Sequence, residues 1–226
     1  YVKRFWDYYS SQDSKYFANQ FGEYILKTLP RIDDDSYVMD YGCGTGGLLP
    51  NLLNRFHYVH ATEFSEDSIK KVNQLFSKYR GFVGVNYPEY FIDLQKKFKL
   101  ITLIEVIEHL DDNYLNITLN SIKDLLQDDG LLLITTPYNE DLSRETVYCP
   151  CCNHTFHRWQ HVRRWNNESL DKELKKHGYR ILRMFSCNIE EKRKPISLIN
   201  IYTQLRRLFK KDFNTPHFVC IATHED

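Results

Sequence analysis

Short apolar runs alternate with longer amphipathic stretches over most of the chain. Many residues in the apolar runs are β-branched or aromatic, and this pattern predicts buried strands. Strands are predicted at 37–40, 58–62, 82–85, 100–105, 131–135, 179–185 and 218–223. Turn-forming residues, above all Gly and Pro, separate several of these runs from the next stretch of chain.

Stretches with apolar residues at helical spacing lie before and between the strands. Helices are predicted at 18–29, from 48 onward, and at 68–79, 114–127 and 166–177. Pro30 closely follows the first helix, and Asp-Asp-Gly130 is expected to end the helix at 114–127. Strands separated by helices of this length form right-handed crossovers and a parallel sheet. The predicted fold class is therefore α/β, with a Rossmann-like, doubly wound and mostly parallel sheet of seven strands.

Three segments depart from this alternation, and a chain of 226 residues has room for them within a single domain spanning 1–226. Residues 1–36 are aromatic and polar, and we expect them to form an N-terminal cap. Residues 138–165 form an insert that concentrates Cys, His and Trp. Residues 189–212 carry many Lys and Arg with apolar residues at helical spacing, which predicts a basic helical insert. Its charges face either a phosphate-bearing ligand or solvent.

The overall charge does not point to a polyanionic partner. Lys and Arg together number 30, and so do Asp and Glu, so no global basic field favours nucleic acid. No stretch approaches the roughly 18 to 20 apolar residues that cross a bilayer, and residues 1–13 lack the apolar run of a signal peptide. We therefore expect a soluble, cytoplasmic protein without a membrane span.

A glycine-rich turn follows the first predicted strand and opens a helix. Asp40 precedes Gly42, Gly44 and Gly46, and glycines in such a turn allow positive φ and let a ligand lie against bare backbone. Glu63 ends the next strand, where a nucleotide-binding fold places a carboxylate for ribose hydroxyls. A dinucleotide dehydrogenase is expected to show Gly-x-Gly-x-x-Gly, whereas the spacing here is Gly-x-Gly-x-Gly.

The run Asp-x-Gly-x-Gly-x-Gly resembles motif I of class I S-adenosylmethionine-dependent methyltransferases, and Glu63-Phe64-Ser65 resembles their second motif. The resemblance continues through 103–110 and 130–137. It implies that S-adenosylmethionine is the cofactor, with Asp40 and the glycine backbone around its methionine end and Glu63 on its ribose. The residues expected in the cofactor site are Asp40, Gly42, Gly44, Gly46, Glu63, Phe64, Ser65 and Glu105.

Glu105-x-x-Glu108-His109 follows the fourth predicted strand, at the sheet edge where open α/β folds bind ligands. Two carboxylates and an imidazole can hold a hard divalent ion such as Mg²⁺. The stretch is similar to the Glu-x-x-Glu-His of ubiquinone-pathway O-methyltransferases and of small-RNA 2′-O-methyltransferases. In the RNA subfamily a later His-x-x-x-Trp adds a ligand, and His161-Val-Arg-Arg-Trp165 matches it. Alternatively, His109 only supports the site, since Glu-His-Leu is widespread after this strand in the fold.

A second group of metal-ligating residue types lies in the Cys/His insert. Cys149-x-x-Cys152, followed by His157 and His161, offers four ligands at a spacing that suits a structural, tetrahedral Zn²⁺. His154 is an alternative to either histidine, and a cysteine cluster without metal remains the other interpretation. His161 belongs to both metal schemes, so at most one of them is right about this residue.

Methyl transfer is an in-line displacement, so the protein must align the acceptor and remove its proton. His109 or His161 is the candidate general base, because histidine titrates near neutral pH, and Glu105 completes the expected catalytic set. Chains with such a Cys/His insert resemble methyltransferases of sugar and surface-glycan pathways, so we expect O-methylation of a small molecule or a sugar- or glycan-linked substrate. Two alternatives stay open: an RNA 2′-O-methyltransferase and a non-catalytic, zinc-containing binding module.

Overall fold

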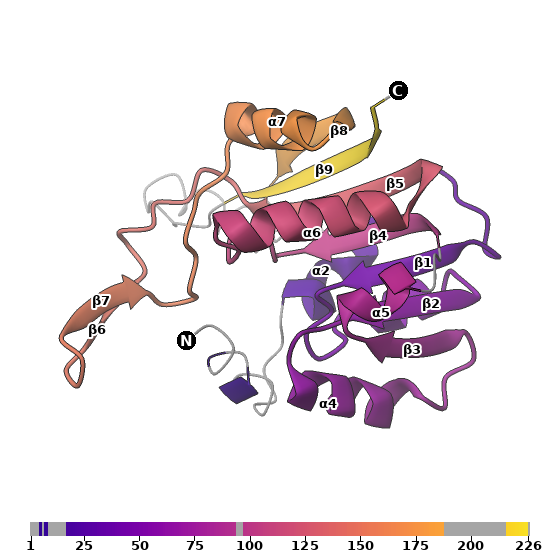
Figure 1. Ribbon diagram of the computed structural model, residues 1–226, viewed down its shortest axis with the longest axis horizontal. Helices are drawn as coiled ribbons and strands as arrows, with labels where there is room; N and C mark the ends of the chain where they lie inside the picture. The colour runs from indigo at the N-terminus through magenta and orange to yellow at the C-terminus, as the bar shows by residue number, and fades with distance from the viewer. Residues whose placement is uncertain (1–4, 6, 9–16, 94–96, 188–215, 226) are drawn as a thin grey trace, which may run out of the picture.

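The computed structural model of the protein describes residues 5, 7–8, 17–93, 97–187 and 216–225. Within these residues, one seven-stranded sheet has the order β3-β2-β1-β4-β5-β9-β8 (Figure 1). Its strands are β1 (Tyr37–Tyr41), β2 (Tyr58–Thr62), β3 (Phe82–Asn86), β4 (Phe98–Ile104), β5 (Leu126–Pro137), β8 (Tyr179–Cys187) and β9 (His217–His224). Strands β1 to β5 are parallel, and β9 is antiparallel to both β5 and β8. The predicted Rossmann-like, mostly parallel sheet is confirmed.

Helices cover both faces of this sheet. They are α2 (Phe17–Leu26), α3 (Leu49–Leu53), α4 (Glu66–Phe76), α5 (Pro88–Asp93), α6 (Asp112–Leu125) and α7 (Asn167–Lys176). Buried side chains of α2, α3 and α4 pack with Val38 in one apolar cluster, whereas those of α5, α6 and α7 pack with Met39 in another. Because these neighbouring residues of β1 enter different clusters, the sheet is buried on both faces, as parallel sheets usually are.

Side-chain caps and one strand irregularity move several helix boundaries from their predicted places. Helices α4 and α6 begin two residues early, because the side chains of Ser65 and Asp111 accept hydrogen bonds from backbone amides three residues on. Helix α6 also ends early. Leu126 adopts an extended conformation (φ −79°, ψ 141°) and opens β5, so residues 128–130 lie in that strand instead of ending the helix. The register of β5 against β4 shifts at this point.

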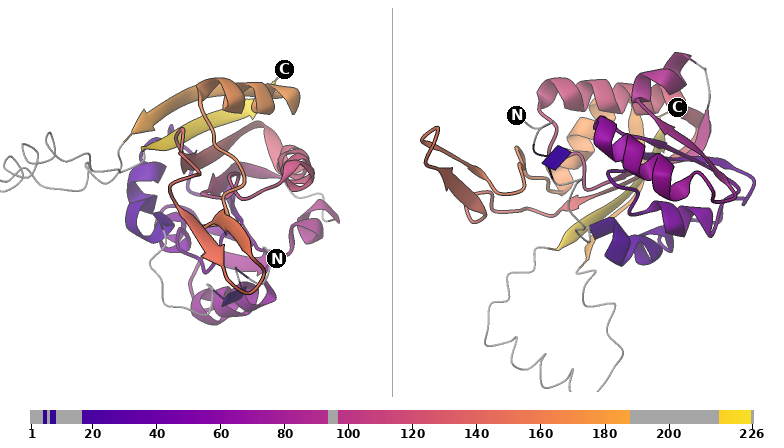
Figure 2. Two further views of the ribbon diagram at one scale, coloured as in Figure 1. Left: turned by 90° about the vertical axis from the view of Figure 1, so that its left-hand side faces the viewer. Right: turned by 90° about the horizontal axis from the view of Figure 1, so that it is seen from below.

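The Cys/His insert contains a hairpin that the sequence did not predict. Strands β6 (Thr146–Cys149) and β7 (His154–His157) form a separate two-stranded antiparallel sheet. Asn153, in the connecting turn, adopts a left-handed conformation with φ 56°. The hairpin projects away from the seven-stranded sheet in Figure 1 and in the right-hand view of Figure 2. The insert is thus an arm joined to the domain at the base of the hairpin.

The other predicted segments are covered only in part. The predicted N-terminal cap includes α2, whose Phe21 and Ile25 are buried in the core, so this part is a core helix. The basic helical insert predicted at 189–212 lies outside the described residues. Of the helices that the structure describes, none has both the length and the apolar character to span a bilayer.

Candidate functional site

The glycine turn between β1 and α3 forms a cradle with one open side. Gly42, Gly44 and Gly46 all have positive φ, at 74°, 55° and 85°. A Cβ atom on Gly46 would lie 2.6 Å from a ring carbon of Phe76, whereas a Cβ on Gly44 would meet no atom within 4 Å. Gly46 is therefore required for packing, and the space above Gly44 is free for a ligand to approach the backbone.

Glu63 closes this cradle from the end of β2. Its Oε2 accepts a hydrogen bond from the Gly44 amide at 2.8 Å, and its Oε1 accepts from the amides of Phe64 (2.7 Å) and Ser65 (3.1 Å). A carboxylate has about four acceptor positions, so capacity remains for a ribose hydroxyl. Burial raises the pKa of Glu63, and these three amides oppose that shift. Phe64 is exposed, while buried Ser65 caps α4 and donates its hydroxyl to Asp7.

Asp40 lies at the centre of the sheet, directly before the glycine turn. The residue is 3% exposed, and its Oδ1 accepts a hydrogen bond from the Thr102 hydroxyl at 2.7 Å. Burial raises its pKa to about 7, and the charge of Glu63 adds to this shift. A cation such as a sulfonium or an ammonium group near Asp40 would favour the ionised carboxylate.

Glu105 is held at the end of β4 in a left-handed conformation, with φ 53°. Its carboxylate lies 3.2 Å from Nδ1 of His217, whose ring stacks on Phe17 at 4.2 Å between centroids. His217 was not among the residues predicted from the sequence. It reaches the site because β9 runs antiparallel to β5 and begins opposite Pro137, which no local sequence signal reveals.

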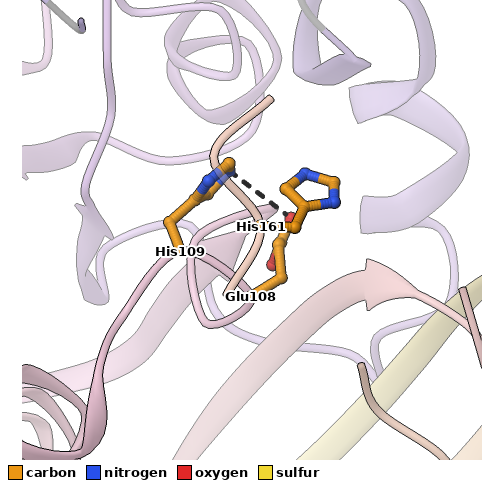
Figure 3. A group of neighbouring side chains, drawn as sticks. All are labelled: Glu108, His109 and His161. Atoms are coloured by element: carbon orange, nitrogen blue, oxygen red, sulfur yellow. Dashed lines mark ion pairs between the residues drawn. The ribbon is translucent and has the colours of Figure 1, made fainter. Parts of the chain in front are cut away.

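Glu108, His109 and His161 form a compact group at the carboxyl end of β4 (Figure 3). One potential ligand atom from each lies within 4.8 Å of the others. Glu108 is 1% exposed; its Oε2 accepts the Thr136 hydroxyl at 2.9 Å, while its Oε1 is buried without a hydrogen-bond partner. That oxygen lies 3.8 Å from Nε2 of His109, and the rings of His109 and His161 meet edge to face at 4.7 Å.

Burial of His109 bears on its two candidate roles, general base and metal ligand. It lowers the pKa of His109 to about 3, with His161 as the second cause, so the imidazole is neutral at physiological pH and a weak base. A neutral imidazole is, however, the form that binds a metal ion. Burial also raises the pKa of Glu108, and the charge of Glu105 adds to this. A nearby cation would favour the ionised form of this carboxylate.

Glu140 is a further member of the site that was not predicted from the sequence. Its Oε2 is 2.5 Å from Nδ1 of His161, and its Oε1 is 3.8 Å from Nε2 of His157. The rings of His157 and His161 stack at 4.6 Å. A hollow of about 500 Å³ adjoins this group. Its lining residues are Cys152, His154, Phe156, His157, Gln160, His161 and Val162.

The four predicted zinc ligands do not form one close group, although Cys152, His157 and His161 line the same hollow. Cys149 and Cys152 lie at the tip of the hairpin, whereas His157 and His161 contact Glu140 at its base. Among the described residues, the groups whose ligand atoms lie within 4.8 Å of one another contain no cysteine. Hydrogen bonds from Cys152 and then Cys151 lower the pKa of the Cys149 thiol. The zinc site stays a prediction.

The parallel sheet, the glycine turn after β1 and the acid ending β2 define the class of Rossmann-like enzymes that bind an adenosine-containing cofactor. Residues 13–183 match a family model described as a methyltransferase domain. The match covers most of the chain, so the protein belongs to this family and is an S-adenosylmethionine-dependent methyltransferase, as its motifs predict. No curated protein sequence matches the chain significantly.

Solved structures agree with this assignment of the fold. An S-adenosylmethionine-dependent methyltransferase of Clostridium acetobutylicum is 17% identical, with 95% of this chain and 94% of that chain covered and a TM-score of 0.63. The Burkholderia thailandensis 1,6-didemethyltoxoflavin-N1-methyltransferase, with 1,6-didemethyltoxoflavin and S-adenosylhomocysteine bound, is 14% identical, with 93% and 79% covered and a TM-score of 0.59. The methyltransferase domain of bacterial CtHen1 is 19% identical, with 91% and 99% covered and a TM-score of 0.58.

Proposed function

We propose that the enzyme transfers the methyl group of S-adenosylmethionine to a hydroxyl oxygen of a small-molecule or glycan-linked acceptor beside Glu108, His109 and His161. One observation carries the proposal: His161, far away in sequence, joins Glu108 and His109 at the carboxyl end of β4. The loop that holds Glu108 and His109 adjoins the glycine turn, since a Cβ on Gly42 would lie 3.0 Å from Val106. The group of Glu108, His109 and His161 therefore lies next to the cradle proposed for the cofactor.

The cofactor supplies an activated methyl group, and the residues of the cradle orient it. The free space above Gly44 admits the cofactor, and the remaining acceptor capacity of Glu63 suits a ribose hydroxyl. Asp40 supplies a negative charge near the cationic end, where ionisation of a carboxyl with a pKa of about 7 is favoured by the cation. Alignment of this kind accounts for much of the rate in an in-line displacement.

Glu108, His109 and His161 suit a divalent ion. The buried Oε1 of Glu108 has no hydrogen-bond partner, and His109 offers a neutral imidazole. Two imidazoles and one carboxylate favour Zn²⁺ or Mn²⁺ over the Mg²⁺ that the sequence suggested, because Mg²⁺ prefers oxygen ligands. Glu105 lies apart from the group, paired with His217. A bound ion would lower the pKa of a coordinated acceptor hydroxyl.

The hollow lined by residues of the Cys/His insert is the proposed binding site for the acceptor. The hollow of about 500 Å³ is lined in part by His157 and His161, and most of its lining surface is apolar, with Phe156 and Val162 among the lining residues. Such a lining suits a sugar-sized acceptor, which has apolar faces as well as hydroxyls. An acceptor hydroxyl at the two histidines would sit next to His161, which lies beside His109 and Glu108.

An RNA 2′-O-methyltransferase is the second candidate, because His161 does join Glu108 and His109 as the resemblance to that subfamily implies. An acceptor screen with radiolabelled methyl donor distinguishes the two candidates. We expect label on small glycosides or glycan precursors and none on RNA. Labelled RNA, together with RNA binding that weakens steeply with salt, would favour the second candidate instead.

Calorimetry with S-adenosylmethionine tests the cofactor site through Glu63→Gln. The glutamine keeps one acceptor oxygen for the turn but loses the charge and the second acceptor. A charge-assisted hydrogen bond contributes about 1.5–3 kcal/mol, so we expect affinity to fall roughly 10- to 100-fold. Glu66→Gln is the matched control, since Glu66 is an exposed carboxylate that pairs with Lys70 on the surface of α4. An unchanged affinity of Glu63→Gln for S-adenosylmethionine would show that Glu63 does not bind the cofactor.

A further inference from the structure

Glu140 lies between a buried histidine, His157, and a partly buried one, His161, of the Cys/His insert. Its Oε2 and Nδ1 of His161 are in hydrogen-bond contact, 2.5 Å apart. The side chains of Glu140, His161 and His157 are 12%, 9% and 4% exposed. Little water therefore reaches the contact, and the carboxylate needs partners within the protein.

A residue with a left-handed backbone conformation precedes both Glu140 and His161. Asn139, with φ 50°, immediately precedes Glu140, and Gln160, with φ 64°, immediately precedes His161. Such conformations cost a non-glycine residue about 1–3 kcal/mol and persist only where the surroundings fix them. Here the Asn139 amide donates to the carbonyl of Trp165 at 2.7 Å. A left-handed residue therefore stands directly before each member of the contact between Glu140 and His161.

Glu140, His157 and His161 also offer ligand atoms within 4.8 Å of one another, a spacing that suits a metal site. The hydrogen bond made by His157 argues against an ion that this histidine shares with Glu140. Nδ1 of His157 accepts the His161 amide at 3.2 Å, so the neutral ring carries its proton on Nε2 and has no lone pair toward Glu140.

The same geometry fixes the tautomer of His161. Because the Glu140 carboxylate accepts at Nδ1, the proton of a neutral His161 ring stays on Nδ1 and the lone pair is on Nε2. His161 also belongs to the group with Glu108 and His109. A carboxylate that holds the outer nitrogen of a ligating histidine orients the ring and makes it a better ligand.

We propose that Glu140 is the positioning residue of a metal centre formed by Glu108, His109 and His161, holding His161 in the tautomer that binds the ion. This inference rests on the proposed function, because it presupposes the ion. Loss of such an outer carboxylate weakens metal binding about 10- to 100-fold. The cofactor site, which contains none of these residues, is unaffected.

The test is a Co²⁺ titration of the full chain, followed by visible d–d absorption, for the wild type, Glu140→Gln and Glu140→Ala. Glu145→Gln is the matched control, since it removes an exposed carboxylate of the same insert. We expect affinity for Co²⁺ to fall about 10- to 100-fold in Glu140→Gln and further in Glu140→Ala. Calorimetry of each variant should give an unchanged affinity for S-adenosylmethionine, which shows that the domain is folded.

Each other outcome overturns the role of Glu140, the metal centre, or both. Equal Co²⁺ affinity in Glu140→Gln and the wild type overturns the role of Glu140 and leaves the metal centre standing. A wild type that binds no Co²⁺ overturns both the centre and the role of Glu140, while bound S-adenosylmethionine would still support the methyltransferase site. A thiolate-to-cobalt charge-transfer band that Cys149→Ser abolishes would place the ion at the hairpin tip, and it would overturn the centre as well.

Discussion

At the scale of single residues, burial of Asp40 makes the stability of the fold depend on pH. Burial raises the pKa of this carboxyl from 3.8 to about 7. Between these values the folded chain holds a proton that the unfolded chain has lost. Because the folded state then binds more protons, the free energy of unfolding decreases as the pH rises from about 4 through about 7.

Asp40→Asn should remove this contribution, since an amide does not titrate. Denaturant unfolding between pH 4 and 8 measures it: relative to the variant, we expect the wild type to lose roughly 3–4 kcal/mol over this window. Asp67→Asn, which changes an exposed carboxylate, is the matched control. Wild-type and Asp40→Asn curves that run parallel would contradict the assigned pKa.

The sequence identifies site residues whose chemistry and spacing are local. Asp40, the glycines and Glu63 belong to a short motif, and the structure does bring Glu63 onto the Gly44 amide. Glu140 and His217 carry no such signal. Glu140 lies 21 residues from His161, and His217 lies 112 residues from Glu105, so only the folded chain brings each to its partner. The weak basicity of His109 likewise follows from burial, which residue type alone does not reveal.

At the scale of elements, two glycines of the turn between β1 and α3 have different roles: Gly46 is needed for packing, and Gly44 leaves space for the cofactor. Ala substitutions test this difference. Gly44→Ala places a methyl group in the open cradle. We expect a loss of stability of about 1–2 kcal/mol from the left-handed backbone and at least about tenfold weaker binding of S-adenosylmethionine, because each 1.4 kcal/mol lost to a clash is a factor of ten.

Gly46→Ala is the counterpart. Its Cβ would lie 2.6 Å from the Phe76 ring and 3.1 Å from Leu49, so overpacking adds to the backbone strain. We expect a loss of roughly 2–4 kcal/mol in the free energy of unfolding. Denaturant unfolding and calorimetry of both variants give the comparison. Wild-type cofactor affinity in Gly44→Ala would show that the cofactor does not lie over this turn.

Hydrophobic periodicity located the strands of the main sheet but not the hairpin. Strands β6 and β7 are four residues each, and most of their side chains are exposed or half-buried, so neither presents an apolar face to a core. The pattern that marks a half-buried strand is therefore absent. The start of β5 was misplaced for a related reason, because an irregular stretch of that strand at 127–130 carries polar residues that resemble a turn.

At the scale of the whole molecule, alternation of strands and helices predicts the parallel part of the sheet, whereas the antiparallel order β5-β9-β8 depends on pairing across a long connection. Spacing along the chain does not encode that pairing. The expected cytoplasmic location and the predicted metal ions stay predictions, and membership of the methyltransferase family is confirmed.

Binding of S-adenosylmethionine should stabilise the whole domain. At a concentration 100 times the Kd, a ligand that binds only the folded state adds about 2.7 kcal/mol. For a chain of this size that raises the Tm by roughly 5–10 °C. Thermal unfolding with and without the cofactor measures this shift, and NAD is the control, because the glycine spacing disfavours a dinucleotide. A shift with NAD alone would contradict the assigned cofactor class.

Because β9 lies between β5 and β8, the sheet cannot be completed until residues 217–224 have been synthesised. While the ribosome makes the chain, β8 emerges before β9, which is its neighbour in the sheet and comes from residues 217–224. Until then β5 and β8 each present a strand edge with unpaired backbone groups, the condition that favours aggregation between nascent chains. A premature stop between 188 and 216 would release the chain in that state, so we expect such truncations to accumulate in inclusion bodies.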